Sequence, residues 1–196
     1  MRTLPLLLLT TLVPATTLLP ATTLLPATAL AGAPAAPTAG KITPRQAKAN
    51  LTLTSTAFAT NQAIPAQYTC DGSGSENAPP LTWSAVPGNT RSVALLVEDP
   101  DAPDGTFTHW LVTGIAPATT SIGAGLPTGA VAAKNGKGDT GYTGPCPPTG
   151  RHRYVFHVYA LETTIPSPAT KEDFLVAIKG HVLAEGQLIG TYQKSK

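Results

Sequence analysis

Proline and glycine constrain this chain more than any other feature of its sequence. It contains 20 Pro and 18 Gly among 196 residues. Proline has no backbone N–H and clashes with the preceding helical turn, and glycine loses the most backbone entropy on folding, so neither suits a helix interior. A bundle of helices is therefore disfavoured, and strands joined by structured loops are expected. The length fits one domain of ordinary size.

Residues 1–31 have the pattern of an export signal. Arg2 is their one charged residue, a Leu-rich stretch follows it, and the triplet Ala29-Leu30-Ala31 provides a small-residue cleavage site. The alternative is a membrane anchor, but prolines recur through the stretch and disfavour a spanning helix. We therefore expect a signal peptide over 1–31 and an exported protein, either periplasmic or secreted.

The charge of the remaining chain argues against a nucleic-acid partner. Residues 32–48 are rich in Ala and Pro and have the composition of a linker, so the folded domain is expected over 49–196. In that range nine Lys+Arg and eleven Asp+Glu give a net charge of −2. A protein that binds nucleic acid through its phosphates needs a basic surface, which this domain lacks.

Hydrophobic patterning predicts a mainly β domain. Apolar residues alternate with polar ones, or run continuously up to a turn, in segments typical of strands. These segments are 50–59, 81–86, 92–97, 106–115, 152–161 and 187–192. The stretch 116–151, rich in Gly, Pro and Asn, is too long for an idle connection and is expected to be a functional loop.

One helix is predicted late in the chain. The segment from Thr170 to Asp173 resembles a capping box with Asp in place of the usual Glu. Apolar residues then follow helical spacing from Phe174 to Leu183. Gly186 is expected to end this helix.

An acidic turn follows the predicted strand 92–97. Asp99 and Asp101 lie two residues apart and would face the same way in an extended chain. Pro100 and Pro103 stiffen the segment and restrict the residues before them, and the bond before Pro103 is a candidate for a cis peptide. The alternative is a solvated turn that merely favours Asp and Pro.

His109 is the next candidate. Strict alternation along 106–112 groups Phe107, His109 and Leu111 on one face. A histidine among apolar neighbours is usually a hydrogen-bonded core residue, unless a carboxylate holds its ring. The acidic turn can supply that carboxylate.

A proline-rich loop precedes the predicted strand 152–161. It carries Gly144, Pro145 and Cys146, and it needs little ordering when a ligand binds. Beyond it, His152 and Tyr154 share one face of the strand while His157 points to the other, which argues against a metal site formed by the two histidines. A metal held by the two Asp and two His of the motifs is an alternative that the ligand spacing disfavours. No cofactor is expected, and His181 is expected at the surface.

The sequence contains two cysteines, Cys70 and Cys146, both inside the predicted domain. An exported protein permits a disulfide between them. Two separate buried thiols are the alternative, and spacing alone does not decide between them.

Three motifs in this order, DPDAP, THWLV and GPCPPTG followed by HRYVFHVYAL, resemble the phosphatidylethanolamine-binding protein family, also called Raf kinase inhibitor-like proteins. The stretches YTCDG and PPLTWSAVPGNTRSVALLVEDPDAP resemble its bacterial branch. The similarity covers about residues 50–194. It implies two antiparallel β-sheets packed as a sandwich, with a small pocket at one end that holds a phosphate-like anion or a phosphoethanolamine headgroup.

The resemblance also implies which residues bind the ligand. Carried over motif by motif, they are Asp99, Asp101, His109, Gly144, Pro145, His152 and Tyr154. Family members often have Trp where this chain has Phe107, which removes an indole donor from the pocket wall. The small cis-proline turn of the family maps to Pro103.

These residues favour a binding protein over an enzyme. A histidine held by Asp favours the imidazolium, which donates to a phosphate oxygen, and a free carboxylate can face an amine. The family name adds inhibition of a partner hydrolase or kinase and peripheral contact with a membrane. The alternative is a phosphate or ester hydrolase with His109 or His152 as acid–base, although Cys146 between prolines is a poor nucleophile.

Overall fold

The computed structural model describes residues 48–72, 77–168 and 170–195. The predicted signal peptide over 1–31 and all but Lys48 of the predicted linker over 32–48 lie outside the described residues. Within the described residues, no helix is both long enough and apolar enough to span a membrane.

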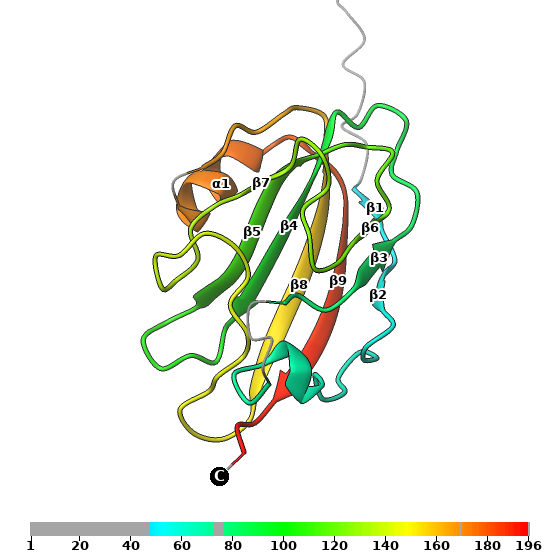
Figure 1. Cartoon of the computed structure of the whole chain (residues 1–196). Coiled ribbons are helices and arrows are strands. Elements are labelled where there is room, and N and C mark those ends of the chain that lie inside the picture. The colour runs from blue at the N-terminus through cyan, green and yellow to red at the C-terminus, as the bar shows by residue number, and fades with distance from the viewer. Residues whose placement is uncertain (1–47, 73–76, 169, 196) are drawn as a thin grey trace, which may run out of the picture. The chain divides into compact units, whose positions relative to one another are not determined.

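The described chain forms two β-sheets, a short 3₁₀ helix and one α-helix (Figure 1). In chain order these are β1 (Ala49–Asn50), β2 (Leu53–Ser55), η1 (Ala66–Tyr68), β3 (Leu81–Trp83), β4 (Ser92–Asp99), β5 (Phe107–Ile115), β6 (Ser121–Ile122), β7 (Val131–Ala132), β8 (His152–Leu161), α1 (Lys171–Ile178) and β9 (Val182–Tyr192). The large sheet has the order β1-β9-β8-β4-β5-β7 and the small sheet the order β2-β3-β6. Neighbouring strands are antiparallel, except that β1 is parallel to β9. The predicted fold class is confirmed.

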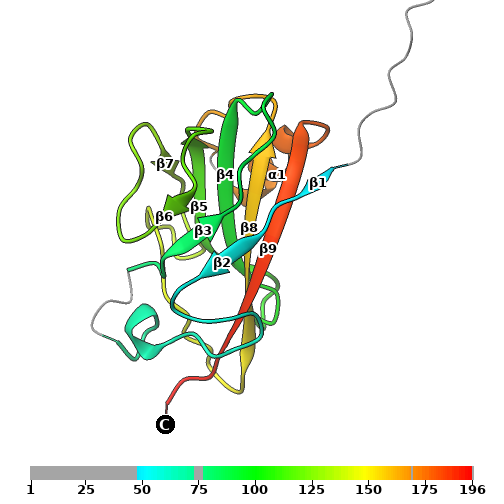
Figure 2. The same cartoon turned by 90° about the vertical axis from the view of Figure 1, so that its right-hand side faces the viewer.

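The small sheet covers one face of the large sheet and α1 covers part of the other (Figure 2). The main core fills the space between the sheets, where β8 contributes Tyr154, Phe156 and Val158. A second cluster lies under α1, where Phe174 and Ile178 pack on Leu96 and Leu111 of the sheet. Strands with both faces covered bury nearly every side chain, which explains the continuous apolar run of β4.

The predicted strand 50–59 is two short strands in different sheets. Leu51 and Leu53 are buried as the alternation predicts. The backbone N–H of Leu51 donates to Glu185 of β9 at 2.8 Å, whereas β2 pairs with β3. A Cβ on Gly186 would lie 2.4 Å from the carbonyl oxygen of Leu51, so this crossing needs glycine. The chain thus links the two sheets here.

The late helix is shorter than predicted. Its start is confirmed, because the Oγ1 of Thr170 accepts the N–H of Asp173 at 3.1 Å. It ends at Ile178, and Gly180 then adopts a φ of 92°, a left-handed conformation that glycine reaches without strain. The prediction that the helix continues to Gly186 is wrong, because β9 begins at Val182 and its ladder to β8 takes these apolar residues.

Candidate functional site

A cavity of about 450 Å³ lies at one end of the large sheet. The turn between β4 and β5 and the loop before β8 meet there, at the lower end of the sheet in Figure 1. The lining comes from the ends of β4 and β8, from the turn between β4 and β5, from β5 and from two parts of the connection between β7 and β8. It comprises Asp99, Ala102, Pro103, Asp104, Gly105, Thr106, Phe107, Thr108, His109, Gly136, Lys137, Gly144, Cys146, Pro147, Pro148 and His152.

A β-bulge turns His109 into this cavity. Val97 of β4 pairs with Trp110, but the next residue of β4, Glu98, pairs with Thr108, so His109 is an extra residue on β5. Bulges change the direction of a side chain and break the alternation of the strand. Leu111 consequently packs under α1 and not beside His109. The prediction that the two share a face is wrong, because strict alternation does not cross a bulge.

The ring of His109 is buried between two aromatic rings. Its centroid lies 4.9 Å from that of Phe107 and 5.1 Å from that of Tyr154, both in edge-on geometry. Its Nδ1 lies 2.6 Å from the carbonyl oxygen of Thr143 and donates to it. Burial lowers the pKa of His109, and nearby Lys137 lowers it further, against the opposing effects of Thr143 and Asp99. Its ring is therefore predominantly neutral at pH 7.

Asp99 holds His152, not His109. The Nδ1 of His152 lies 2.7 Å from one carboxylate oxygen of Asp99, and the other oxygen accepts the backbone N–H of Asp101 at 2.8 Å. The side chains of His152 and Asp99 are 10% and 5% exposed, so the pair is desolvated. The expectation that the acidic turn orients His109 is wrong, because the bulge directs that ring to a carbonyl.

Asp101 binds Arg153 and does not line the cavity. Its carboxylate accepts from the Nη2 of Arg153 at 2.6 Å, from its Nε at 2.9 Å and from its backbone N–H at 2.9 Å. The hydrogen bonds from Arg153 lower the pKa of Asp101 to about 2. Neither Asp99 nor Asp101 is therefore the free carboxylate that was expected to face an amine.

The proline-rich loop is fastened to the segment around η1. Cys70 and Cys146 form a disulfide, with 5.3 Å between their Cα atoms, which decides between the two alternatives for this pair. The N–H of Cys70 also donates to the carbonyl oxygen of Pro145 at 3.0 Å. Gly144 lines the cavity, whereas Pro145 is buried behind it.

Tyr154 is buried beneath the site. Its ring supports His109, but Tyr154 does not line the cavity, and its hydroxyl is buried without a hydrogen-bond partner among the described residues. Of the seven predicted ligand-binding residues, four thus line the cavity: Asp99, His109, Gly144 and His152. Of the other three, Asp101 donates its backbone N–H to Asp99, Tyr154 packs against His109, and Pro145 is buried next to Gly144 in the chain.

Sequence reasoning predicted a functional loop over 116–151 but did not single out Gly136 and Lys137, both of which line the cavity. Asn135 shapes this loop, since its Oδ1 accepts from the N–H of Lys137 at 2.9 Å and its Nδ2 donates to Gly141 at 3.1 Å. A Cβ on Gly136 would lie 2.5 Å from the ring of Phe107, so the ring packs directly against the backbone of Gly136. The Asn-Gly dipeptide signals a turn, but no local signal places Lys137 beside His109.

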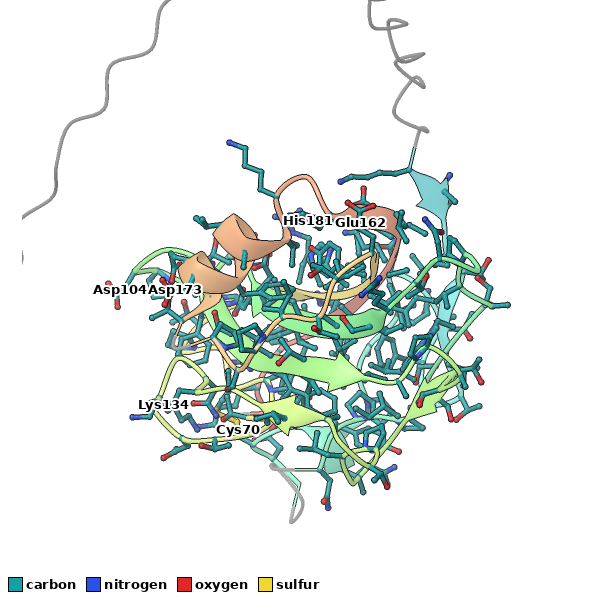
Figure 3. All side chains as sticks on the ribbon, turned by 90° about the horizontal axis from the view of Figure 1, so that it is seen from above. Cys70, Asp104, Lys134, Glu162, Asp173 and His181 are labelled. Carbon is teal, nitrogen blue, oxygen red and sulfur yellow. A yellow bond between two sulfur atoms is a disulfide. The ribbon has the colours of Figure 1, made fainter. Side chains whose placement is uncertain are left out.

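The remaining sequence candidates lie elsewhere or differ from expectation. The peptide bond before Pro103 is trans, since no cis bond occurs within the described residues. His181 lies at the surface, as expected. It lies beside Glu162, with 3.2 Å between its Nδ1 and the carboxylate (Figure 3). Residues 48–72, 77–168 and 170–195 contain no group of three or more His, Cys, Asp or Glu that could hold a metal ion.

The profile described as "Phosphatidylethanolamine-binding protein" matches residues 54–193. The chain belongs to this family. It is 48% identical over 147 residues to a "UPF0098 protein" of Methanothermobacter thermautotrophicus, which covers 70% of this chain and 95% of the relative. It is also 41% identical over 165 residues to LppC of Mycobacterium tuberculosis, named as a candidate lipoprotein, with 82% of this chain and 81% of the relative covered.

A solved structure of the phosphatidylethanolamine-binding family has the same fold. The crystal structure of the homologue CT736 from Chlamydia trachomatis superposes with a TM-score of 0.69 at 40% sequence identity. The match covers 74% of this chain and 99% of CT736. The family resemblance and the fold that it implied are thereby confirmed.

Proposed function

We propose that this protein is a non-catalytic binding protein whose cavity takes a small phosphate-like anion, either free or as a phosphoethanolamine headgroup. The observation that carries this proposal is the pair of histidines. His109 and His152 come from different strands and line one cavity. Each ring uses its Nδ1 inside the protein, on Thr143 or on Asp99, so its Nε2 is the atom left to bind a ligand.

The other lining groups support an anion. Lys137 is the one Lys or Arg among the described residues of the lining, and its long side chain can place a positive charge at the rim. The negative charge of Asp99 is engaged by His152 and by the N–H of Asp101. The remaining lining carboxylate, Asp104, is exposed and well solvated. The cavity volume suits a headgroup-sized ligand.

Hydrolysis is the second candidate, and the Asp99–His152 pair is the observation that favours it. A histidine held by a carboxylate is a common general base. Among the described residues that line the cavity, none is an activated nucleophile, because Cys146 is bonded to Cys70 and the lining hydroxyls belong to Thr106 and Thr108. Water would have to be the nucleophile. We therefore favour binding without turnover.

The setting of the protein is also proposed. A signal-like start over 1–31 and a disulfide both suit an exported protein, and the LppC relative named as a lipoprotein is consistent with this. An exported chain would meet a secreted hydrolase more readily than a cytosolic kinase if its rim inhibits a partner. Contact with a membrane surface would give it access to phospholipid headgroups.

Calorimetric titration with inorganic phosphate and with phosphoethanolamine tests the proposal. We expect saturable binding at one site and a loss of affinity of about tenfold or more in His109→Ala or His152→Ala, as for the loss of a hydrogen bond to a charged group. His181→Ala is the matched control, because that histidine is exposed and distant from the cavity. Equal affinity in all variants would contradict the proposal, and turnover of a phosphate ester that vanishes in His152→Ala would favour the hydrolase.

A further inference from the structure

The two histidines of the cavity differ in the partner of their Nδ1. His152 donates to a carboxylate, whereas His109 donates to a neutral carbonyl. We infer that the cavity selects a phosphate group that brings its own proton, so that hydrogen phosphate and phosphate monoesters bind more tightly than sulfate and phosphate diesters. This inference rests on the proposed function and specifies the chemistry of its ligand.

The hydrogen bond to Thr143 fixes the tautomer of His109. A carbonyl oxygen can only accept a hydrogen bond, so the proton of the neutral ring stays on Nδ1. The distance of 2.6 Å between this Nδ1 and the oxygen of Thr143 is that of a short hydrogen bond. The Nε2 of the neutral ring is then a lone pair at the cavity wall. A ligand atom next to this Nε2 must therefore donate a hydrogen bond. A ligand oxygen without a proton would place two hydrogen-bond acceptors against each other, which is unfavourable.

The surroundings of His109 do not favour a second proton on its ring. Phe107 and Tyr154 enclose the ring with apolar edges. Across the cavity, the loop after β7 contributes positive Lys137 and β8 contributes His152. The charge of Asp99 at the end of β4 is directed to His152, and Asp104 on the turn is exposed. Burial and Lys137 accordingly lower the pKa of His109.

Phosphate chemistry supplies the missing donor. A phosphate monoester has a second pKa of about 6, so a proton is available to its oxygens near neutral pH. Phosphate diesters and sulfate carry no such proton at that pH. In the complex one proton bridges a phosphate oxygen and the Nε2 of His109, while the other oxygens face His152 and Lys137. An intact phosphodiester headgroup, as in phosphatidylethanolamine, is consequently a poorer ligand than phosphoethanolamine.

Phosphate and sulfate provide the sharpest comparison, because the two anions have nearly the same size and shape. In titrations of the wild-type protein at pH 7, phosphate should bind at least about tenfold more tightly, the effect of one hydrogen bond to a charged group. The affinity for phosphoethanolamine should exceed the affinity for glycerophosphoethanolamine, the corresponding diester, by a similar factor. Vesicles with a monoester lipid, phosphatidic acid, against vesicles of phosphatidylcholine distinguish a lipid source of the phosphate from a soluble one.

The dependence on pH separates this inference from simple charge attraction. A site that reads charge alone would gain affinity for phosphate between pH 6 and 8, as the ligand becomes a dianion. A site that needs the bridging proton loses affinity for phosphate over the same range. The loss reaches up to about tenfold per pH unit once the free phosphate and the ring of His109 in the free protein are both deprotonated. A rise in phosphate affinity from pH 6 to 8 would overturn the inference.

Two variants provide matched controls. His109→Gln offers an amide N–H to either anion, so the ratio of phosphate to sulfate affinity should fall toward one. Lys137→Met removes charge but leaves the hydrogen bond from His109 to Thr143 and the burial of that ring in place, so both affinities should fall by a similar factor and the ratio should persist. Nitrogen NMR of the wild-type protein needs no variant: at pH 7 His109 should be neutral and protonated on Nδ1, and a charged or Nε2-protonated ring would overturn the inference.

The possible failures can be told apart. Equal affinities for phosphate and sulfate in the wild-type protein would overturn the proton requirement and leave the proposed anion-binding function standing. Absence of binding by both anions would overturn the proposed function itself, and the inference with it.

Discussion

The Nδ1 of His152 lies 2.7 Å from a carboxylate oxygen of Asp99, and both side chains are buried at the cavity. The two residues are 53 positions apart in the chain. Asp99 is the last residue of β4 and His152 is the first residue of β8, and these two strands are neighbours in the large sheet. Such a pair costs desolvation energy to form, and removal of one partner leaves the other without compensation. We therefore expect the pair to contribute both to the proposed ligand site and to the stability of the fold.

His152→Ala should destabilise the protein by about 2–4 kcal/mol, because Asp99 remains buried and its Oδ2 loses the ring N–H of His152, while its Oδ1 keeps the N–H of Asp101. Urea denaturation monitored by tryptophan fluorescence measures this. His181→Ala should cost less than about 0.5 kcal/mol, since its contact with Glu162 is exposed. A loss in His152→Ala no larger than in the control would contradict a structural role for the pair.

Stability should fall as the pH drops below about 6.5. The pKa of His109 is lowered by burial, so the unfolded chain takes up this proton first and the unfolding free energy decreases with falling pH. Well above pH 6.5 the ring is neutral in both states and its contribution is complete. His157, whose pKa is also lowered by burial, adds to the same trend.

Urea midpoints between pH 7.5 and 5 test this trend in the wild-type protein and in His109→Asn. The variant should show a shallower dependence on pH, whatever its absolute stability. Superimposable pH profiles would mean that His109 does not resist protonation in the folded state.

Loss of the Cys70–Cys146 disulfide should cost about 2–5 kcal/mol, because the bridge closes a loop with a sequence separation of 76 residues. The double variant Cys70→Ser with Cys146→Ser avoids an unpaired thiol. Its ligand affinity should also fall, since Cys146 lines the cavity and its loop loses a covalent fastening. Denaturation and calorimetry on the same samples measure both effects, and unchanged values for both would refute the predicted role.

Gly136→Ala should weaken ligand binding more than it weakens the fold. The new methyl group would press on the ring of Phe107, which must move toward the cavity that it lines. We expect a severalfold loss of phosphate affinity with a stability cost of about 1 kcal/mol. Gly125→Ala is the matched control, because nothing lies within 4 Å of its added Cβ. Identical affinities in the two variants would count against the prediction.

Tyr154→Phe should leave phosphate affinity within about twofold and stability within about 1 kcal/mol of the wild type. The hydroxyl is buried without a partner among the described residues and does not line the cavity, while the ring that supports His109 is retained. Titration and denaturation check the two expectations. A tenfold loss of affinity would show that this hydroxyl reaches the ligand.

Local patterns predicted much of the fold. The apolar patterns predict the long strands β4, β5 and β8 and the C-terminal half of β9, and the segment at Thr170 predicts the N-cap of α1. The end of α1 was missed because Val182 and Leu183 suit either a helix or a strand. Only pairing with β8 decides between them, and no residue within one turn of the helix carries that information.

The sequence by itself determined the mainly β architecture, the family and the identity of the two histidines, because these follow from local hydrophobic periods and from motifs of adjacent residues. The tertiary structure alone decided which carboxylate holds which ring. One extra residue in β5 turns His109 toward Thr143, and Asp99 is left to His152. It also brought Lys137 to the cavity from a distant loop. Hydrogen bonds between side chains far apart in the chain depend on strand register, which is set by the packing of the whole sheet.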